Sequence, residues 1–309
     1  MFMRRVNSSF KLFGFFVMLG LLGSFIISGC QKETPTESQL SSAVATEDAA
    51  QSISSSLSVN SGGAIEQIAD MVNISSSAGL SNDASTMTVG GKLNNATITR
   101  TYDSTNGWWN ATVTRERSNI SGTIHSTYTR VYKYQYINAN GAFQKNYITV
   151  NGATSDTAVT INHEIFSGTG YAVTPRIDHK LLSLTGKWIV TNANSDTVTF
   201  NSLSSNPYSR SSSDTVTTWN GMRTLNSSLV LNFTDVKGAR GSGLNWRSKA
   251  SGKITGTYHA IVSVLKGQTY TEKTIDRAFD ITIGGTNPII NVNGKRFSME
   301  PIYGEITAL

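Results

Sequence analysis

The sequence predicts a mainly β protein: an antiparallel meander of about a dozen strands, curled into an open barrel or a sandwich and preceded by one or two short helices. Three observations support this prediction. From about residue 80 onward, apolar and polar residues alternate with period two. Threonine, valine and aromatic residues, which favour strands, fill these runs. Turn-forming pairs such as Asn-Gly separate the runs, and this pair is a strong hairpin signal.

The first 29 residues are predicted to be a secretory signal peptide. Arg4, Arg5 and Lys11 form a basic start, and residues 12–29 carry no charge. A basic segment, an apolar segment and small residues before a cleavage point occur in this order in signal peptides. The alternative is an uncleaved transmembrane helix, because about 17 to 25 apolar residues can span a bilayer. Gly14, Gly20 and Gly23 within the uncharged run and the small residues Ser28 and Gly29 at its end argue against that alternative.

Cys30 is the only cysteine in the chain, and it follows Ile27, Ser28 and Gly29. These four residues resemble the lipobox of bacterial lipoproteins, in which an aliphatic residue and two small residues precede a cysteine. The resemblance implies that a diacylglycerol is attached to the Cys30 thiol through a thioether, that the chain is cut after Gly29, and that the new amino group is acylated. Two or more acyl chains hold a protein stably on a membrane, whereas one is marginal. We therefore expect a membrane-tethered protein.

The residue after the cysteine bears on localisation. In lipoproteins of bacteria with two membranes, an aspartate there often signals retention in the inner membrane, whereas this chain has Gln31. The resemblance, which covers only about the first 35 residues, therefore implies the outer membrane, on its periplasmic or its surface face.

Composition excludes several other classes. Removing residues 1–29 deletes three basic residues and no acidic ones, so the formal charge falls from +6 to +3. No run of Lys and Arg exceeds two residues, which argues against a nucleic-acid partner. With Cys30 lipidated, no thiol remains for a disulfide or a cysteine metal site. We expect no cofactor and no metal.

Three segments follow the signal peptide. Residues 30–45 are rich in Ser, Thr, Glu and Pro, which predicts a flexible tether. Residues 46–80 carry apolar side chains at helical spacing on either side of Gly62-Gly63, which predicts a short helical segment with a break. Disorder is the alternative there, because the serines at 54–56 are poor helix formers. Residues 81–309 are predicted to form the antiparallel β-domain.

Particular positions define the strands and turns of that domain. Turns are expected at Asn106-Gly107, Asn140-Gly141, Asn151-Gly152, Gly284-Gly285 and Asn293-Gly294. Between the first and second of these turns, aromatic residues at even positions, Tyr128, Tyr132, Tyr134 and Tyr136, form one stripe. The Ser-Asp-Thr sequences at 155–157, 195–197 and 213–215 are interpreted as turns that lead into strands.

No catalytic motif emerges, and we do not expect an enzyme. His163-Glu164 begins like the zinc-protease H-E-x-x-H motif, but the motif ends in Ser167 and lies in an alternating run instead of on a helix. Asp178 and His179 are neighbours, so on a strand their side chains point to opposite faces and cannot couple. No G-x-S-x-G nucleophile turn is present.

Trp108 and Trp109 are the candidate binding residues. Adjacent strand residues face opposite ways, so one ring can enter the core while the other points outward as a platform for a sugar or a protein partner. The alternative is that both rings are covered.

The function expected from these observations is a non-catalytic binding or structural role for a lipid-anchored cell-envelope protein, with an envelope protein or a glycan as partner. One alternative is a carrier that holds a lipid or another apolar ligand in its curved sheet. A second alternative is a hydrolase of envelope polymers, supported only by scattered acids and histidines.

Overall fold

The computed structural model describes residues 42–59, 61–75, 87–89, 95–118, 125–152, 154–173, 177–218, 221–239, 250–266, 269–302 and 304–309. The predicted signal peptide, the lipobox with Cys30 and most of the predicted tether lie outside these residues. The elements, in chain order, are α2 (Ser42–Leu57), α3 (Ala64–Ser75), β1 (Met87–Val89), β2 (Asn95–Asp103), β3 (Trp108–Ser118), β4 (His125–Ile137), β5 (Phe143–Gln144), β6 (Ile148–Asn151), β7 (Thr154–Thr157), β8 (Thr160–Val173), β9 (Ile177–Thr191), β10 (Thr197–Ser202), β11 (Tyr208–Thr218), β12 (Gly221–Ala239), β13 (Ser251–Lys266), β14 (Thr269–Ile283), β15 (Ile289–Val292), β16 (Lys295–Met299) and β17 (Ile306–Ala308).

The helical region contains the two helices and the break that the sequence predicted. Ile53 and Leu57 bury the apolar face of α2, and Ile65 and Ile68 bury that of α3. Between the helices, Gly62 has a φ of 67°, a left-handed conformation that glycine adopts without steric cost. Helix α2 begins at Ser42, four residues before the expected start, because residues 43–45 are Ala-Val-Ala and continue the helical pattern.

All five predicted hairpin turns lie between paired strands. They join β2 to β3, β4 to β5, β6 to β7, β14 to β15, and β15 to β16. At the last of these turns, Asn293 and Gly294 have φ angles of 52° and 81°. Positive φ at both central residues is the geometry whose twist matches an antiparallel hairpin, and Asn-Gly is the pair that tolerates it best.

The strands form one 15-stranded antiparallel sheet and a separate 2-stranded hairpin, β6–β7. Along most of the sheet, the strand order follows the chain. Two places depart from this order. Strand β8 pairs with β4, because β5 pairs only with β4 and β6–β7 form the separate hairpin. Between β9 and β12, the strands β10 and β11 pair with successive stretches of these two longer strands. Among the described residues, β1 and β17 form the two edges and do not pair with each other, so the sheet is open.

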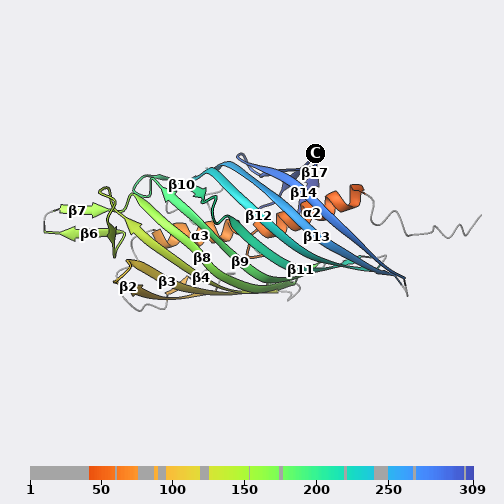
Figure 1. Ribbon diagram of the computed structural model, residues 1–309, viewed down its shortest axis with the longest axis horizontal. Helices are drawn as coiled ribbons and strands as arrows, with labels where there is room; N and C mark the ends of the chain where they lie inside the picture. Colours follow the sequence, from red (N-terminus) through yellow and green to blue (C-terminus); the bar gives the residue numbers. More distant parts are fainter. Residues whose placement is uncertain are drawn as a thin grey trace, which may run out of the picture. The chain divides into compact units, whose positions relative to one another are not determined.

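The sheet curves around the two helices. Helix α3 contacts β3 and β4 near one edge through the side chains of Glu66 and Asp70. Helix α2 contacts β14, β15, β16 and β17 near the other edge. Strands from opposite halves of a sheet can contact one pair of short helices only if the sheet bends, and Figure 1 shows the helices lying along its inner face. We call this inner surface the concave face.

The predicted class is therefore confirmed: the protein is mainly antiparallel β, and two short helices precede the sheet in the chain. Of the two predicted arrangements, the structure has a single open, curved sheet, in which the helices cover the face that a second sheet would cover in a sandwich. It has more strands than expected because several are short, such as β5 and β17. No described helix has both the length and the apolar character required to cross a membrane.

Candidate functional site

A buried group of charged side chains joins α3 to the sheet. We call it the α3 ion-pair cluster; it consists of Glu66 and Asp70 of α3, Arg115 of β3, and Arg130 and Tyr132 of β4. Arg130 Nη2 lies 2.7 Å from Glu66 Oε2, and its Nη1 lies 3.3 Å from Asp70 Oδ2. Arg115 Nε lies 3.2 Å from Glu66 Oε1, and its Nη2 pairs with Asp70 Oδ1. The Tyr132 hydroxyl donates to Asp70 Oδ2 at 2.9 Å.

Local periodicity explains how this cluster assembles. Glu66 and Asp70 are four residues apart on a helix, so their side chains share one face. On β4, the even-numbered residues, which include the tyrosine stripe, are buried, and Arg130 occupies an even position within that stripe. This cluster was not predicted from the sequence. An acid pair with spacing i, i+4 in an apolar helix, together with an arginine inside a buried aromatic stripe, was the available signal.

Every carboxylate in the α3 ion-pair cluster faces cationic or hydroxyl donors. Burial acts to lower the pKa of Arg130, but its surroundings, which include the Asp70 carboxylate, outweigh burial and raise that pKa above its ordinary value. Burial also raises the pKa of Tyr132, so its hydroxyl stays protonated and donates. Arg130 further donates to the Gly62 carbonyl at 2.8 Å, just before α3. The cluster therefore holds the first turns of α3 against the sheet.

A second buried group, which we call the histidine cluster, consists of His179 of β9 and Arg210, Ser212 and Asp214 of β11. Residues 179 and 214 face each other in register, and His179 Nδ1 is hydrogen-bonded to Asp214 Oδ1. Arg210 contacts His179 Nε2 and donates to the carbonyl of Ser56 at 3.1 Å, in the last turn of α2. A cation at a helix C-terminus is electrostatically favourable, so this cluster holds the end of α2.

The partners of His179 determine its protonation. A guanidinium only donates hydrogen bonds, so Nε2 accepts from Arg210 and the ring proton resides on Nδ1, where it is donated to Asp214. Burial and then the Arg210 charge lower the pKa of His179, against the opposing effect of Asp214. Ser212 donates to Asp214 at 3.2 Å instead of to the imidazole. The cluster contains the residue types of a catalytic triad, but the imidazole lone pair is already used by Arg210.

The structure confirms that Asp178 and His179 point to opposite faces, because Asp178 is exposed and His179 is buried. It also corrects the interpretation of the Ser-Asp-Thr sequences as turns. Residues 213–215 lie within β11, and residues 155–157 lie within β7; only 195 and 196 lie between strands. In β11, alternation directs Asp214 inward toward His179, and this cross-strand partner was invisible in the sequence.

An aromatic row crosses the concave face beside the α3 ion-pair cluster. Strand register aligns Tyr102, Trp109, Tyr134, His163 and Trp188 on β2, β3, β4, β8 and β9. Tyr102 and Trp109 have ring centroids 5.0 Å apart, and Trp109 and Tyr134 stack at 6.2 Å. The His163 ring stacks on Trp188 at 5.5 Å. This row gives the concave face an amphipathic aromatic surface.

His163 is a buried polar group within this row. Neither of its ring nitrogens has a hydrogen-bond partner in the part of the chain that the structure describes. Burial lowers its pKa to about 3, so the imidazole is neutral. Its neighbour Glu164 points to the other face and pairs with Lys187 at 3.4 Å. His163-Glu164 lies on strand β8, as its alternating pattern predicted, and not on the helix that the zinc-protease motif requires.

The two candidate tryptophans begin β3 and have different surroundings. Trp109 is buried, and its indole Nε1 donates to the Lys145 carbonyl at 2.7 Å, with the Arg100 guanidinium 5.5 Å from the ring. Trp108 is half-buried and faces the other side of the sheet. Trp108 is thus the member of the pair that offers surface to a ligand, and a binding role for either tryptophan stays a prediction.

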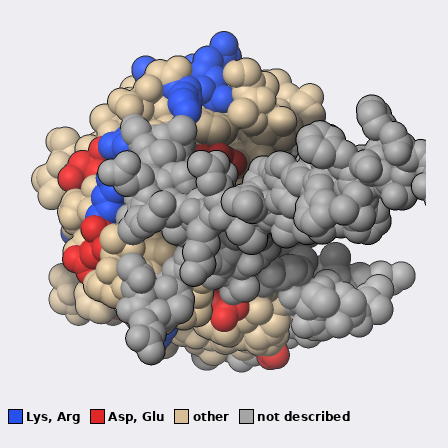
Figure 2. Space-filling model, turned by 90° about the vertical axis from the view of Figure 1, so that its right-hand side faces the viewer, with Lys and Arg blue, Asp and Glu red and all other residues tan. Residues whose placement is uncertain are grey.

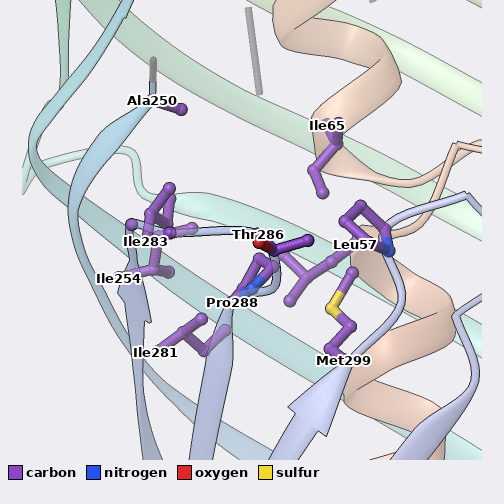
Figure 3. A pocket seen from close by; sticks show the side chains of 12 residues that line it. Leu57, Ile65, Ala250, Ile254, Ile281, Ile283, Thr286, Pro288 and Met299 are labelled. Carbon is purple, nitrogen blue, oxygen red and sulfur yellow. The ribbon is translucent and has the colours of Figure 1, made fainter. Parts of the chain in front are cut away.

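A small apolar pocket lies where the two helices meet the sheet (Figure 3). Leu57 of α2, Ile65 of α3 and Met299 of β16 point into it from one side, and Ile254 and Ile281 of β13 and β14 line the other. Its cavity volume is about 30 Å³. A cavity needs about 10–15 Å³ of such space to hold one water molecule, so this pocket is small.

Among the described residues, no group of three or more His, Cys, Asp or Glu side chains is arranged to hold a metal ion. Comparisons of the chain with protein-family models, with curated proteins and with solved structures find no match.

Proposed function

We propose that this chain is a lipid-anchored protein of the outer membrane that binds an envelope protein or glycan without catalysing a reaction. The anchor rests on the lipobox at residues 27–30 and on the signal peptide before it. The binding or structural role rests on the curved sheet and on the state of its buried charged groups.

The observation that carries the non-catalytic role is the saturation of these groups. Glu66 and Asp70 are each paired with two arginines, and the His179 lone pair accepts from Arg210. General acid–base catalysis needs a group that can exchange a proton with a bound substrate. These clusters instead bind the helices to the sheet, which favours a rigid scaffold over the hydrolase alternative.

The anchor and the partner are tested together in intact cells. Cys30→Ala should abolish incorporation of labelled palmitate and release the protein from the membrane fraction, whereas Ser38→Ala in the tether serves as a matched control. Crosslinking of intact envelopes, followed by mass spectrometry, should recover a protein or glycan with the wild-type chain. Unchanged labelling of the Cys30 variant would refute the anchor, and repeated crosslinking without any partner would count against the binding role.

A second candidate function is a carrier of a lipid or another apolar ligand. The specific observation in its favour is the aromatic row, which lies on the concave face among buried arginines. Helices α2 and α3 fill the space along this face, so loading requires them to move. Native mass spectrometry of delipidated protein incubated with phosphatidylglycerol would reveal a bound lipid. If Glu66→Gln with Asp70→Asn, which weaken the seat of α3, does not increase lipid binding over wild type, the carrier role fails.

A further inference from the structure

The exposed apolar side chains at one end of the sheet form a row. Met222 at the start of β12 faces Leu265 of β13 in register, and Leu265 faces Tyr270 of β14. Residues opposite one another in a sheet share a face, so the three side chains lie side by side. They are 47%, 49% and 61% exposed. We call Met222, Leu265 and Tyr270 the tip row, because they lie where the β11–β12 and β13–β14 hairpins turn.

The start of α2 lies at the same end of the domain. Arg223, next to Met222 in the chain, forms an ion pair with Asp48 of α2, with Nη1 and Oδ2 3.0 Å apart. Ser42, the first residue of α2, is six residues before Asp48, or about 9 Å along the helix axis. In Figure 1 the helix begins on the side of the picture toward which strands β11 to β14 converge.

The length of chain before α2 limits how far this end can be from the anchor. Eleven residues separate Cys30 from Ser42, and an extended chain spans at most about 3.3–3.6 Å per residue. The start of α2 therefore stays within about 40 Å of a lipidated Cys30. We infer that the tip row contacts the bilayer that holds the anchor, and that this contact orients the domain. The inference depends on the proposed lipid anchor.

The chemistry of the tip row suits the boundary between water and acyl chains. Tyrosine is enriched there because its ring is apolar and its hydroxyl is polar. The Tyr270 hydroxyl lies 2.7 Å from Glu272 Oε2 and 3.1 Å from Ser263 Oγ. Viewed from this end, Lys and Arg gather at the top of the face and lie next to Asp and Glu at its left, and further Asp and Glu lie lower (Figure 2). With both signs present, the contact depends on apolar burial more than on anionic lipid.

Three side chains give only a weak attachment by themselves. When the anchor holds the domain near the bilayer, the tip row meets the membrane surface at an effective concentration of roughly millimolar, as in an intramolecular contact. The tip row then sets the orientation of a protein that its acyl chains already retain.

The test uses the full lipidated chain in vesicles. Because lipidation consumes the only native cysteine, Leu265→Cys introduces a single free thiol for an environment-sensitive fluorophore. Val150→Cys on β6 and Leu182→Cys on β9, which are 69% and 48% exposed, are matched controls at other exposed apolar positions. In vesicles of phosphatidylethanolamine and phosphatidylglycerol, the label at 265 should shift to shorter wavelength and lose most of its intensity to spin-labelled lipid. Vesicles of phosphatidylcholine alone should give the same shift.

The outcomes separate the alternatives. An unshifted label at 265 on protein that floats with the vesicles overturns the inference and leaves the anchor intact. Failure to float overturns the anchor and the inference with it. A shift that grows with protein concentration in the absence of vesicles identifies a second copy of the chain as the occupant and also overturns it. Met222→Glu in the labelled chain should reduce the shift, and an undiminished shift would contradict the tip row as the contact.

Discussion

Arg130 of β4 and Glu66 of α3 form a 2.7 Å ion pair whose side chains are 1% and 2% exposed. The pair lies beside Tyr128 and Tyr132, which belong to the buried face of the same strand. Ion pairs at such depth are costly to separate, since removing one partner leaves the other charge desolvated. The helices are thus held on the concave face by charge as well as by apolar packing.

Single substitutions in this pair should destabilise the protein strongly. Arg130→Met or Glu66→Gln is expected to lower the free energy of unfolding by about 3–5 kcal/mol. The double variant Glu66→Leu with Arg130→Met removes both charges and leaves Asp70 paired with Arg115, so it should recover most of the loss. Urea unfolding monitored by tryptophan fluorescence measures these differences.

A partly exposed pair provides the control for this prediction. Lys187 and Glu164 lie 3.4 Å apart on the sheet, and Lys187→Met should cost less than about 1 kcal/mol. If the Arg130 and Lys187 variants lose equal stability, burial does not increase the contribution of the ion pairs in the α3 ion-pair cluster to the free energy of unfolding.

His163 should make stability depend on pH. Its pKa is about 3 in the folded protein, against 6.5 as the ordinary value, so below pH 6.5 the unfolded chain binds a proton that the native state excludes. The contribution of neutral His163 to the free energy of unfolding is therefore fully present above pH 6.5 and is lost as the pH falls. Between pH 7 and pH 5, His163 should account for a loss of about 2 kcal/mol. His163→Phe, which keeps an aromatic ring in the row, should reduce the wild-type loss by this amount.

Urea unfolding at pH 7 and pH 5 tests the His163 prediction. His259→Asn removes an imidazole from an exposed position and serves as the control. A His163→Phe protein with the wild-type pH dependence would show that His163 is protonated in the native state.

Asp48 should give stability a pH dependence opposite in sign to that of His163. Burial raises its pKa to about 6 against the opposing effect of Arg223, so between pH 4 and pH 7 the native state binds the proton more tightly than the unfolded chain. Its contribution to stability is present below pH 4 and is lost as the pH rises through 6. The stability difference between wild type and Asp48→Asn should therefore fall by about 2 kcal/mol from pH 4 to pH 7.

Asp103 is the counterpart for this measurement. A hydrogen bond from Asn106 and the backbone amide of Thr105 lower its pKa, so the difference for Asp103→Asn should change with pH in the reverse sense. If the Asp48 difference stays constant or rises with pH, Arg223 outweighs burial at that site.

Replacing Gly186 and Gly284 by alanine should have different effects on stability. A Cβ at Gly186 on β9 would lie 2.8 Å from the Tyr208 Cα, which is backbone and cannot give way easily. Gly186→Ala should therefore cost about 1–3 kcal/mol. At Gly284, nothing lies within 4 Å of the added atom, and Gly284→Ala should leave stability nearly unchanged. Thermal unfolding of both variants compares them, and equal melting temperatures would contradict the close approach of β9 and β11.

Much of the fold could be predicted because it depends on short-range patterns. Alternation on β4 predicted that its tyrosines share one face, and Asn-Gly pairs such as Asn293-Gly294 predicted turns whose conformation few other residues adopt. The Gly62 break predicted where the helices part. The candidate site was less accessible, because Glu66 and Arg130 are 64 residues apart and their pairing depends on where α3 meets the sheet.

The sequence by itself indicated most of the secondary structure, the even-position stripe and the prediction of a lipid anchor at Cys30, because each depends on residues close together in the chain. Only the tertiary structure decided that the sheet stays open, that the helices lie on its concave face and that Asp214, instead of Asp178, meets His179. The physical reason is that curvature and strand register bring distant residues together. The desolvation cost of burying a charge is offset only where a residue of opposite charge lies next to it.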